Sequence, residues 1–250
     1  MRSGLLASVA VLASLAAAPA ARAQTPEGWN FAISPYVWMA AMSGDMTIGQ
    51  RSAGSTASFG DLLGDLRFGV MGAAEVRFGR FGVVADLMYL DLQSGVNLPA
   101  DRAFSGGQAT LRSTTLTLEA MYRVVDEQQG WLDIGAGIRP WWVDPGLRLN
   151  AGALPGRTLG TSVNWTDPII AMRGHVRLGQ QFGLTVYGDI GGFGAGSQLT
   201  WQVMGTIDWN ATQNLTARAG WRYMAVDFQN GRASFDLTIN GPILGLTYRF

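Results

Sequence analysis

One pattern constrains this chain more than any other. From Phe31 to Phe250, segments of about ten or more residues alternate apolar side chains with polar or small ones. Successive side chains of a strand point to opposite faces of a sheet, so alternation with a period of two predicts strands. The predicted strands are 31–39, 67–78, 81–92, 110–125, 131–143, 166–178, 182–193, 199–209, 215–228 and 234–250.

The connections between these strands are of two kinds. Short turns are predicted near residues 79, 128, 180 and 212, whereas several of the other connections are long, at 43–66, 95–109 and 146–165. Short turns at one end, longer loops at the other and an even strand count are typical of transmembrane barrels. The predicted fold class is therefore all-β, a closed antiparallel up-and-down transmembrane β-barrel of about ten strands, with eight or twelve as alternatives.

Two details of the strands and loops are left as expectations. The last strand changes its alternation phase near Gly241-Pro242, which predicts a bulge because proline cannot donate to a strand ladder. The segment 61–66 in the first long connection could form a short helix folded into or over the mouth, although an ordinary ordered loop is the favoured interpretation.

The N-terminus has the features of an export signal. Arg2 is followed by an apolar stretch over 5–18 and a small-residue ending at Ala21-Arg22-Ala23. The apolar run is shorter than the roughly 20 residues of a membrane span, so a cleaved signal peptide is favoured over an anchor helix. The predicted domains are a signal peptide over 1–23 and a barrel over 24–250. The chain has no cysteine, which excludes disulfides and thiolate metal sites.

The charges are balanced and fall on one phase of the strands. Removal of Arg2 and Arg22 with the signal leaves 16 of the 18 basic residues, all arginine, against 18 acidic ones, so nucleic-acid binding is not expected. An arginine facing lipid costs up to about 2–4 kcal/mol near the bilayer midplane, so these charges are expected inside the barrel, paired across neighbouring strands. The predicted lumen charge network is Glu75, Arg77, Asp86, Glu119, Arg123, Asp133, Arg139, Arg173, His175, Arg177, Asp189, Arg218, Arg222 and Arg249.

Aromatic residues support lipid on the outside, because two aromatic girdles flank the apolar band of a membrane barrel. Core packing is the alternative explanation of these residues. The predicted girdle beside the short turns is Trp29, Phe31, Phe78, Phe81, Trp131, Phe182, Trp209 and Phe250. The predicted girdle towards the long loops is Trp38, Tyr89, Trp142, Phe193, Trp201 and Phe228.

Several short motifs resemble those of known outer-membrane proteins. Leu246, Tyr248 and Phe250 share one phase of the last strand, which resembles the C-terminal signature that the barrel-assembly machinery of the outer membrane reads. The chain also resembles a poorly characterised, porin-like group of proteobacterial outer-membrane barrels. That resemblance rests on WNF at 29–31, PYVW at 35–38, FGDLL at 59–63 and GRFGV at 79–83. It implies the fold and a place in the cell outer membrane, and it transfers no catalytic or ligand residues.

Catalytic chemistry has few candidates. His175 is the only histidine, so a Ser-His-Asp arrangement or a histidine metal site would have to use it. It lies between Arg173 and Arg177 near the predicted periplasmic end, which favours a hydrogen-bonded place in the charge network. Glu119 and Asp133 lie on adjacent strands, where the surrounding arginines favour ion pairing over acid–base catalysis. No catalytic residue, metal or cofactor is predicted.

The predicted function is that of a non-enzymatic outer-membrane barrel, either a narrow passive pore or a structural envelope component. An outer-membrane lipid-modifying enzyme and a soluble periplasmic lipid-binding barrel are the alternatives. Eight strands give a filled interior and sixteen or more give a channel, so ten should be nearly closed by their own side chains. Expected partners are outer-membrane lipid, lipopolysaccharide and the assembly machinery, with no nucleic acid, and the protein is expected to be a monomer.

Overall fold

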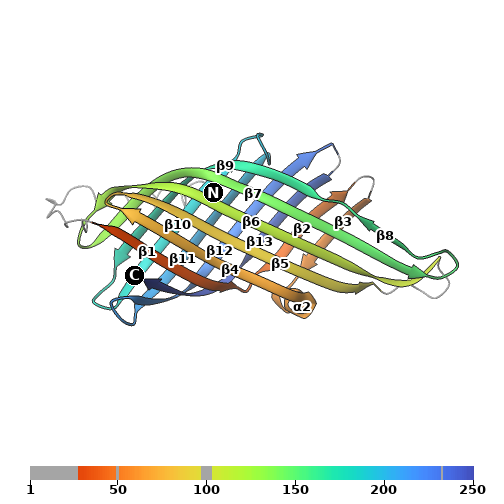
Figure 1. Ribbon diagram of the computed structural model, residues 1–250, viewed down its shortest axis with the longest axis horizontal. Helices are drawn as coiled ribbons and strands as arrows, with labels where there is room; N and C mark the ends of the chain where they lie inside the picture. The colour runs from red at the N-terminus through yellow and green to blue at the C-terminus, as the bar shows by residue number, and fades with distance from the viewer. Residues whose placement is uncertain (1–27, 49–50, 97–102, 232) are drawn as a thin grey trace, which may run out of the picture.

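The computed structural model describes residues 28–48, 51–96, 103–231 and 233–250. Its tilted strands wrap around a common axis, with the short turns at the left in Figure 1. Ten strands form the wall, and the sheet closes because the last of them pairs antiparallel with the first. The wall strands are β1 (Trp29–Trp38), β4 (Leu66–Phe78), β5 (Phe81–Val96), β6 (Phe104–Asp126), β7 (Gly130–Ala151), β9 (Val163–Arg177), β10 (Phe182–Gly192), β11 (Leu199–Asn210), β12 (Leu215–Asn230) and β13 (Ala233–Arg249).

The predicted fold class is confirmed, as are the ten wall strands. Each of them overlaps one predicted segment, and the four short turns lie where the sequence placed them. The predicted signal peptide over 1–23 lies outside the described residues. Within the described residues, no helix combines the length and the apolar character that a membrane crossing requires.

The favoured interpretation of segment 61–66 as an ordinary ordered loop was wrong, because most of it belongs to a helix, and the described parts of the other long connections also contain strands. The described residues between 41 and 65 form two further strands and a helix, β2 (Ala41–Ile48), β3 (Arg51–Ala57) and α2 (Phe59–Asp65). β6 and β7 have 23 and 22 residues against 11 in β10, and β8 (Arg157–Gly160) pairs with the far end of β7. The paired ribbon projects to the right in Figure 1. Backbone groups beyond the wall still need partners, and continued pairing satisfies them.

The predicted bulge at Gly241-Pro242 is also wrong. The register of β13 is unbroken against β12 from Leu215↔Tyr248 to Asn230↔Ala233. On its other side β13 pairs with β2 over 233–240 and with β1 over 243–249. Between β1 and β2 only Met39 and Ala40 lie outside a strand. Pro242 lies opposite this gap and has no N–H to donate, although its carbonyl accepts from the Met39 N–H at 2.9 Å. The phase change therefore needs another explanation.

The explanation lies in the barrel interior, which has two halves of different character. Inward side chains near the short turns, here called the turn-side half, are charged or polar, as Asp133 and Arg173 are. Inward side chains towards the long loops, the loop-side half, are largely apolar, as Trp141 and Phe235 are. Outward side chains of the wall are apolar throughout. In the turn-side half they alternate with polar inward side chains, but in the loop-side half the inward side chains are apolar too. The pattern of hydrophobicity along β13 therefore changes although its backbone is regular.

Candidate functional site: the barrel interior

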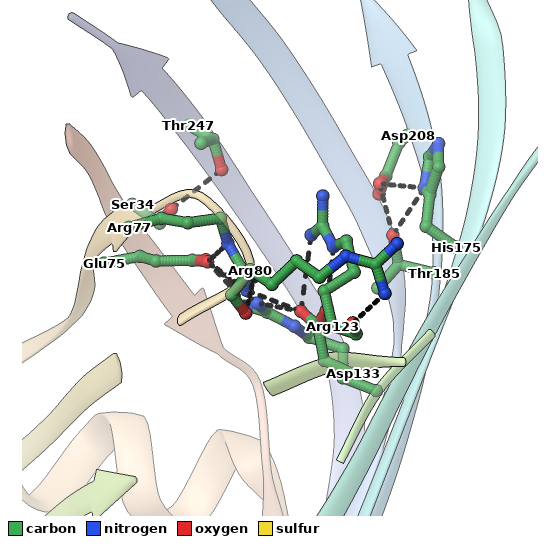
Figure 2. A network of polar contacts seen from close by, with 11 residues as sticks. Ser34, Glu75, Arg77, Arg80, Arg123, Asp133, His175, Thr185, Asp208 and Thr247 are labelled. Atoms are coloured by element: carbon green, nitrogen blue, oxygen red, sulfur yellow. Dashed lines mark hydrogen bonds and ion pairs between the residues drawn. The ribbon is translucent and has the colours of Figure 1, made fainter. Parts of the chain in front are cut away.

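A cluster of five charged side chains lies nearest the short turns, and we call it the turn-side cluster. It consists of Glu75, Arg77, Arg123, Asp133 and Arg173, and Figure 2 shows its centre. Asp133 is fully buried and accepts hydrogen bonds from Arg77 Nη2 at 2.6 Å, Arg123 Nε at 2.9 Å and Arg173 Nη2 at 3.0 Å. Arg173 also binds both oxygens of Glu75 at 2.9 Å. Charge-assisted, bidentate bonds of this kind are the strongest hydrogen bonds in proteins.

The strand register explains two of the three arginine contacts of Asp133. Arg123 and Arg173 are the direct cross-strand neighbours of Asp133 on β6 and β9. Arg77 comes from β4, which is not next to β7, so its side chain must pass over β5. Gly82 lies on β5 directly opposite Arg77, and a Cβ atom there would lie 3.0 Å from Arg77 Nη2. The missing side chain at Gly82 therefore provides the space through which Arg77 reaches Asp133.

Trp131 caps the cluster at the turn side. Its ring lies 4.4 Å from the Arg123 guanidinium carbon and 5.0 Å from that of Arg173, and it stacks on the His175 ring. Cation–π contacts of this geometry add attraction that the hydrogen bonds alone do not supply. The prediction of Trp131 as part of an outer girdle was wrong, because the side chain belongs to the lumen.

His175 belongs to a separate group beside the cluster. Its Nδ1 lies 3.0 Å from Thr185 Oγ1 and 3.6 Å from Asp208 Oδ2, and the Thr185 hydroxyl donates to Asp208 at 2.6 Å. Thr206 donates to the other Asp208 oxygen, and Arg218 lies 3.5 Å from it. Figure 2 shows His175, Thr185 and Asp208 together on neighbouring strands. A catalytic triad needs its acid and its hydroxyl on different ring nitrogens, and here both face Nδ1.

A second layer, which we call the central belt, crosses the barrel further from the turns. Arg139 is fully buried and binds both oxygens of Asp189, and its Nε donates to Thr117 at 3.0 Å. The Tyr187 hydroxyl contacts both Asp189 and Glu119. Because these partners come from β6, β7 and β10, the belt joins opposite parts of the wall.

The belt continues through an amide to the other side of the lumen. Gln202 donates to Asp189 at 2.6 Å and accepts from Arg222 Nε at 2.8 Å. Arg222 Nη1 donates to the Tyr36 hydroxyl at 3.0 Å and lies 3.2 Å from Asp86 Oδ2. Tyr36 in turn donates to Asp86 at 2.6 Å. Hydrogen bonds therefore run without interruption from β6 to β5 by way of β7, β10, β11, β12 and β1.

Two predicted network residues lie at the rim. Arg177 is exposed at the end of β9, and within the described residues no ion pair involves it. Arg249 is exposed near the end of β13 and donates to Thr216 at 2.8 Å. The remaining predicted residues lie inside the barrel. Glu119 and Asp133, considered as an acid–base pair, belong to the belt and to the turn-side cluster respectively.

The sequence reasoning missed the uncharged members of the belt. Tyr36, Thr117, Tyr187 and Gln202 each bind at least one charged residue of the belt. The signal was present, because each of them falls on the polar phase of its strand. The predicted lumen network contained only ionisable residues, so it left these four out.

Two predicted girdle residues also lie inside. Trp38 and Phe228 are 4% and 3% exposed and belong to the apolar loop-side half, whereas Phe193 and Trp142 are exposed on the outer wall. Both misplaced aromatics are near the loop-side ends of their strands. Their position along the strand is the same as that of a girdle residue, but their phase is inward.

The fold and its interior define the class of protein. Apolar residues such as Ile134, Ile170 and Val203 are exposed on the wall, while charges are buried within. An apolar outer wall around a polar interior is the arrangement of transmembrane β-barrels of the outer-membrane type.

Comparisons with known proteins give no family for this chain. No protein-family model matches it, and no curated protein matches it. Among solved structures, it is similar to the transport unit of the autotransporter AIDA-I from Escherichia coli, with 10% identity over 98% of this chain and 97% of that one and a TM-score of 0.44. The translocator domain of autotransporter NalP from Neisseria meningitidis has 12% identity, covers 97% and 93% and has a TM-score of 0.43. Ail from Yersinia pestis has 12% identity, covers 90% and 99% and has a TM-score of 0.34. The porin-like family stays a prediction.

Proposed function

We propose that this protein is a non-enzymatic barrel of the outer membrane whose lumen is sealed by its own side chains, and that it serves as a structural envelope component rather than as an open pore. The single observation that carries the proposal is the central belt. The side chains of Arg139 and Asp189 are both fully buried and bind each other across the lumen, and we infer that this pair closes the axis to water. A cavity of about 340 Å³ remains in the turn-side half and ends at the belt.

The distribution of side chains supports the membrane location. A soluble lipid-binding barrel would need an apolar interior and a polar outer wall. Here Leu246, Tyr248 and Phe250 are 51%, 47% and 68% exposed on the outer wall, as a C-terminal signal for the assembly machinery would need to be. Outer-membrane lipid and lipopolysaccharide are the proposed surroundings of this wall.

The geometry of His175 supports a non-enzymatic role. Its Nδ1 faces a hydroxyl and a carboxylate that already bind each other, and Thr185 is only 2% exposed, so a substrate could not reach that oxygen. Replacing His175 with Gln should therefore leave the lipid composition of the envelope unchanged. A changed lipid profile would support the alternative of a lipid-modifying enzyme.

Planar-bilayer conductance of the refolded protein tests the sealed lumen. Wild type should show no stable open steps, and the double variant R139A/D189A should show them, because removing both partners opens the belt without leaving an unpaired buried charge. The control is R112A, whose side chain is 60% exposed at the loop side. Stable steps from wild type equal to those of the double variant would overturn the proposal.

A further inference from the structure

The loop-side half of the lumen contains a second cavity, of about 270 Å³, with an apolar wall. Its lining includes the aromatic side chains Trp38, Trp141, Trp165 and Phe235. The Trp165 ring stacks on the Trp141 ring at 5.3 Å and 12° and lies 5.9 Å from the Phe235 ring. These three rings give the cavity one flat, aromatic side.

The polar atoms of these aromatic side chains already have partners. The indole N–H groups of Trp141 and Trp165 both donate to Asp167, at 3.0 and 3.1 Å. The other Asp167 oxygen accepts from the Ser197 N–H and hydroxyl. Trp38 donates to the Gly241 carbonyl at 3.2 Å. The wall therefore holds its rings in place by bonds directed away from the cavity, and it offers a ligand mainly dispersion and apolar contact.

The barrel wall is interrupted beside this cavity. Pairing of β1 with β4 runs from Trp29↔Phe78 to Pro35↔Gly72 and stops there. Beyond that point the end of β1 pairs with β13 alone and residues 66–71 of β4 pair with β5 alone, so no described strand fills the seam between them. Unpaired strand edges are costly in lipid, which makes such a seam an exception in a membrane barrel. Val37, 58% exposed on the outer wall, also lines the cavity, so the cavity reaches the surface at the seam.

Helix α2 covers the seam. Its apolar residues are Phe59, Leu62 and Leu63, followed by Leu66 at the helix end, a spacing that puts all four on one face. All four line the cavity. The helix contacts β5 on one side and β2 and β3 on the other, and Figure 1 shows it beside the loop-side part of β5. A helix that begins with its own capping box and is tied to the wall by few side chains can move without breaking the barrel.

We propose that the loop-side cavity binds a small uncharged apolar molecule of one or two rings, which enters from the bilayer through the seam beneath α2. The cavity is larger than the roughly 150 Å³ at which a dry apolar cavity already binds benzene. Its flat aromatic side fits a planar molecule. The central belt closes the route from the turn side, whereas the seam opens onto the lipid-facing wall. The route rests on the proposed membrane location, and the binding itself does not.

Equilibrium dialysis of radiolabelled naphthalene against the protein in detergent micelles tests the binding. Wild type should bind with saturation at one molecule per chain. L62D, which places a charge in the cover, and L111W, which fills the cavity from the wall, should each weaken binding at least tenfold. The matched control is L154D, an exposed leucine outside the cavity, which should bind as wild type does. No saturable binding by wild type, or equal binding by all variants, would overturn the site.

Tethering across the seam tests the route. The chain has no cysteine, so V37C and L66C introduce one thiol on each side of the seam. Joining them with a bis-maleimide should slow naphthalene uptake from liposomes at least tenfold relative to the same double variant whose two thiols are capped singly with N-ethylmaleimide. Uptake at an unchanged rate after tethering would show entry through the loop-side mouth and overturn the lateral route. Conductance tests the sealed lumen, whereas dialysis and uptake test the cavity and its route. Failure of one proposal can therefore be told from failure of the other.

Discussion

The two halves of the lumen are built from the same ten strands but close the barrel by different means. The turn-side half is held by directional bonds, in which Asp133 joins arginines from three strands. The loop-side half is held by packing of rings such as Trp165 and Phe228, whose centroids are 4.1 Å apart. A directional bond stabilises the structure only when both partners are in place, so the stability of the turn-side half depends on each residue of its network. Packing is less specific, and it leaves a cavity bounded by apolar atoms.

The largest expected effect comes from the centre of the polar half. D133A leaves three guanidinium groups inside the barrel without their common acceptor and should lower the free energy of unfolding by about 3–5 kcal/mol. Urea unfolding in liposomes, followed by the mobility shift of folded barrels on electrophoresis, measures this. The control is D144A on the same strand, where the side chain is exposed and little change is expected. Equal effects of the two variants would contradict the distinction between the halves.

A smaller loss is expected in the apolar half. Phe235 is 1% exposed, and F235A should lower the free energy of unfolding by about 3 kcal/mol, at the low end for a buried Phe because the ring already faces a cavity. The same unfolding assay applies. L244A on the same strand faces outward and should cost under about 1 kcal/mol, since lipid tails replace the lost contacts. A greater loss in L244A than in F235A would mean that inside and outside are wrongly assigned.

Two glycines of β10 differ in the space beside them, which tests how tightly the turn-side half is packed. A Cβ atom at Gly183 would lie 2.4 Å from His175 Cε1, whereas at Gly188 the nearest atom would be 3.6 Å away. G183A should therefore destabilise the turn-side half by about 1–3 kcal/mol, as overpacking does, while G188A should be tolerated. Thermal unfolding of both variants, with H175A added to G183A to restore the space, tests this. A G183A protein as stable as wild type would show that the ring is not held over Gly183.

The smallest effect concerns the cover of the apolar half. Hydrogen bonds from the Ser58 hydroxyl and N–H lower the pKa of Asp61 below its ordinary value of about 3.9. The cap is therefore complete at neutral pH, and its contribution to α2 is lost as the pH falls through that lowered pKa. Amide exchange of α2 should be faster at pH 2.5 than at pH 5 after correction for intrinsic rates. D61N, which removes the titrating carboxylate, should lack this acceleration, and its persistence in D61N would rule out the cap as the cause.

Much of this molecule could be predicted before its structure was known. Alternation of side chains placed the ten wall strands and the four short turns, because a strand must put every second residue on the same face. The pairs of Asp133 with Arg123 and Arg173 also follow from strand order, because strands that are consecutive along the wall lie side by side and place these residues opposite each other. Contacts such as Arg77 with Asp133 do not follow, because they join strands that are not neighbours and depend on the space above Gly82.

The sequence by itself determined which residues share a face, since the period of a strand is fixed by its backbone. It did not determine what each face meets. The phase change in β13 looked like a defect of the strand, yet the strand is regular and the lumen changes from polar to apolar around it. Only closure of the sheet brings ten inward faces together at each height. The character of the interior is therefore a property of the tertiary structure, as is the cavity beside the seam.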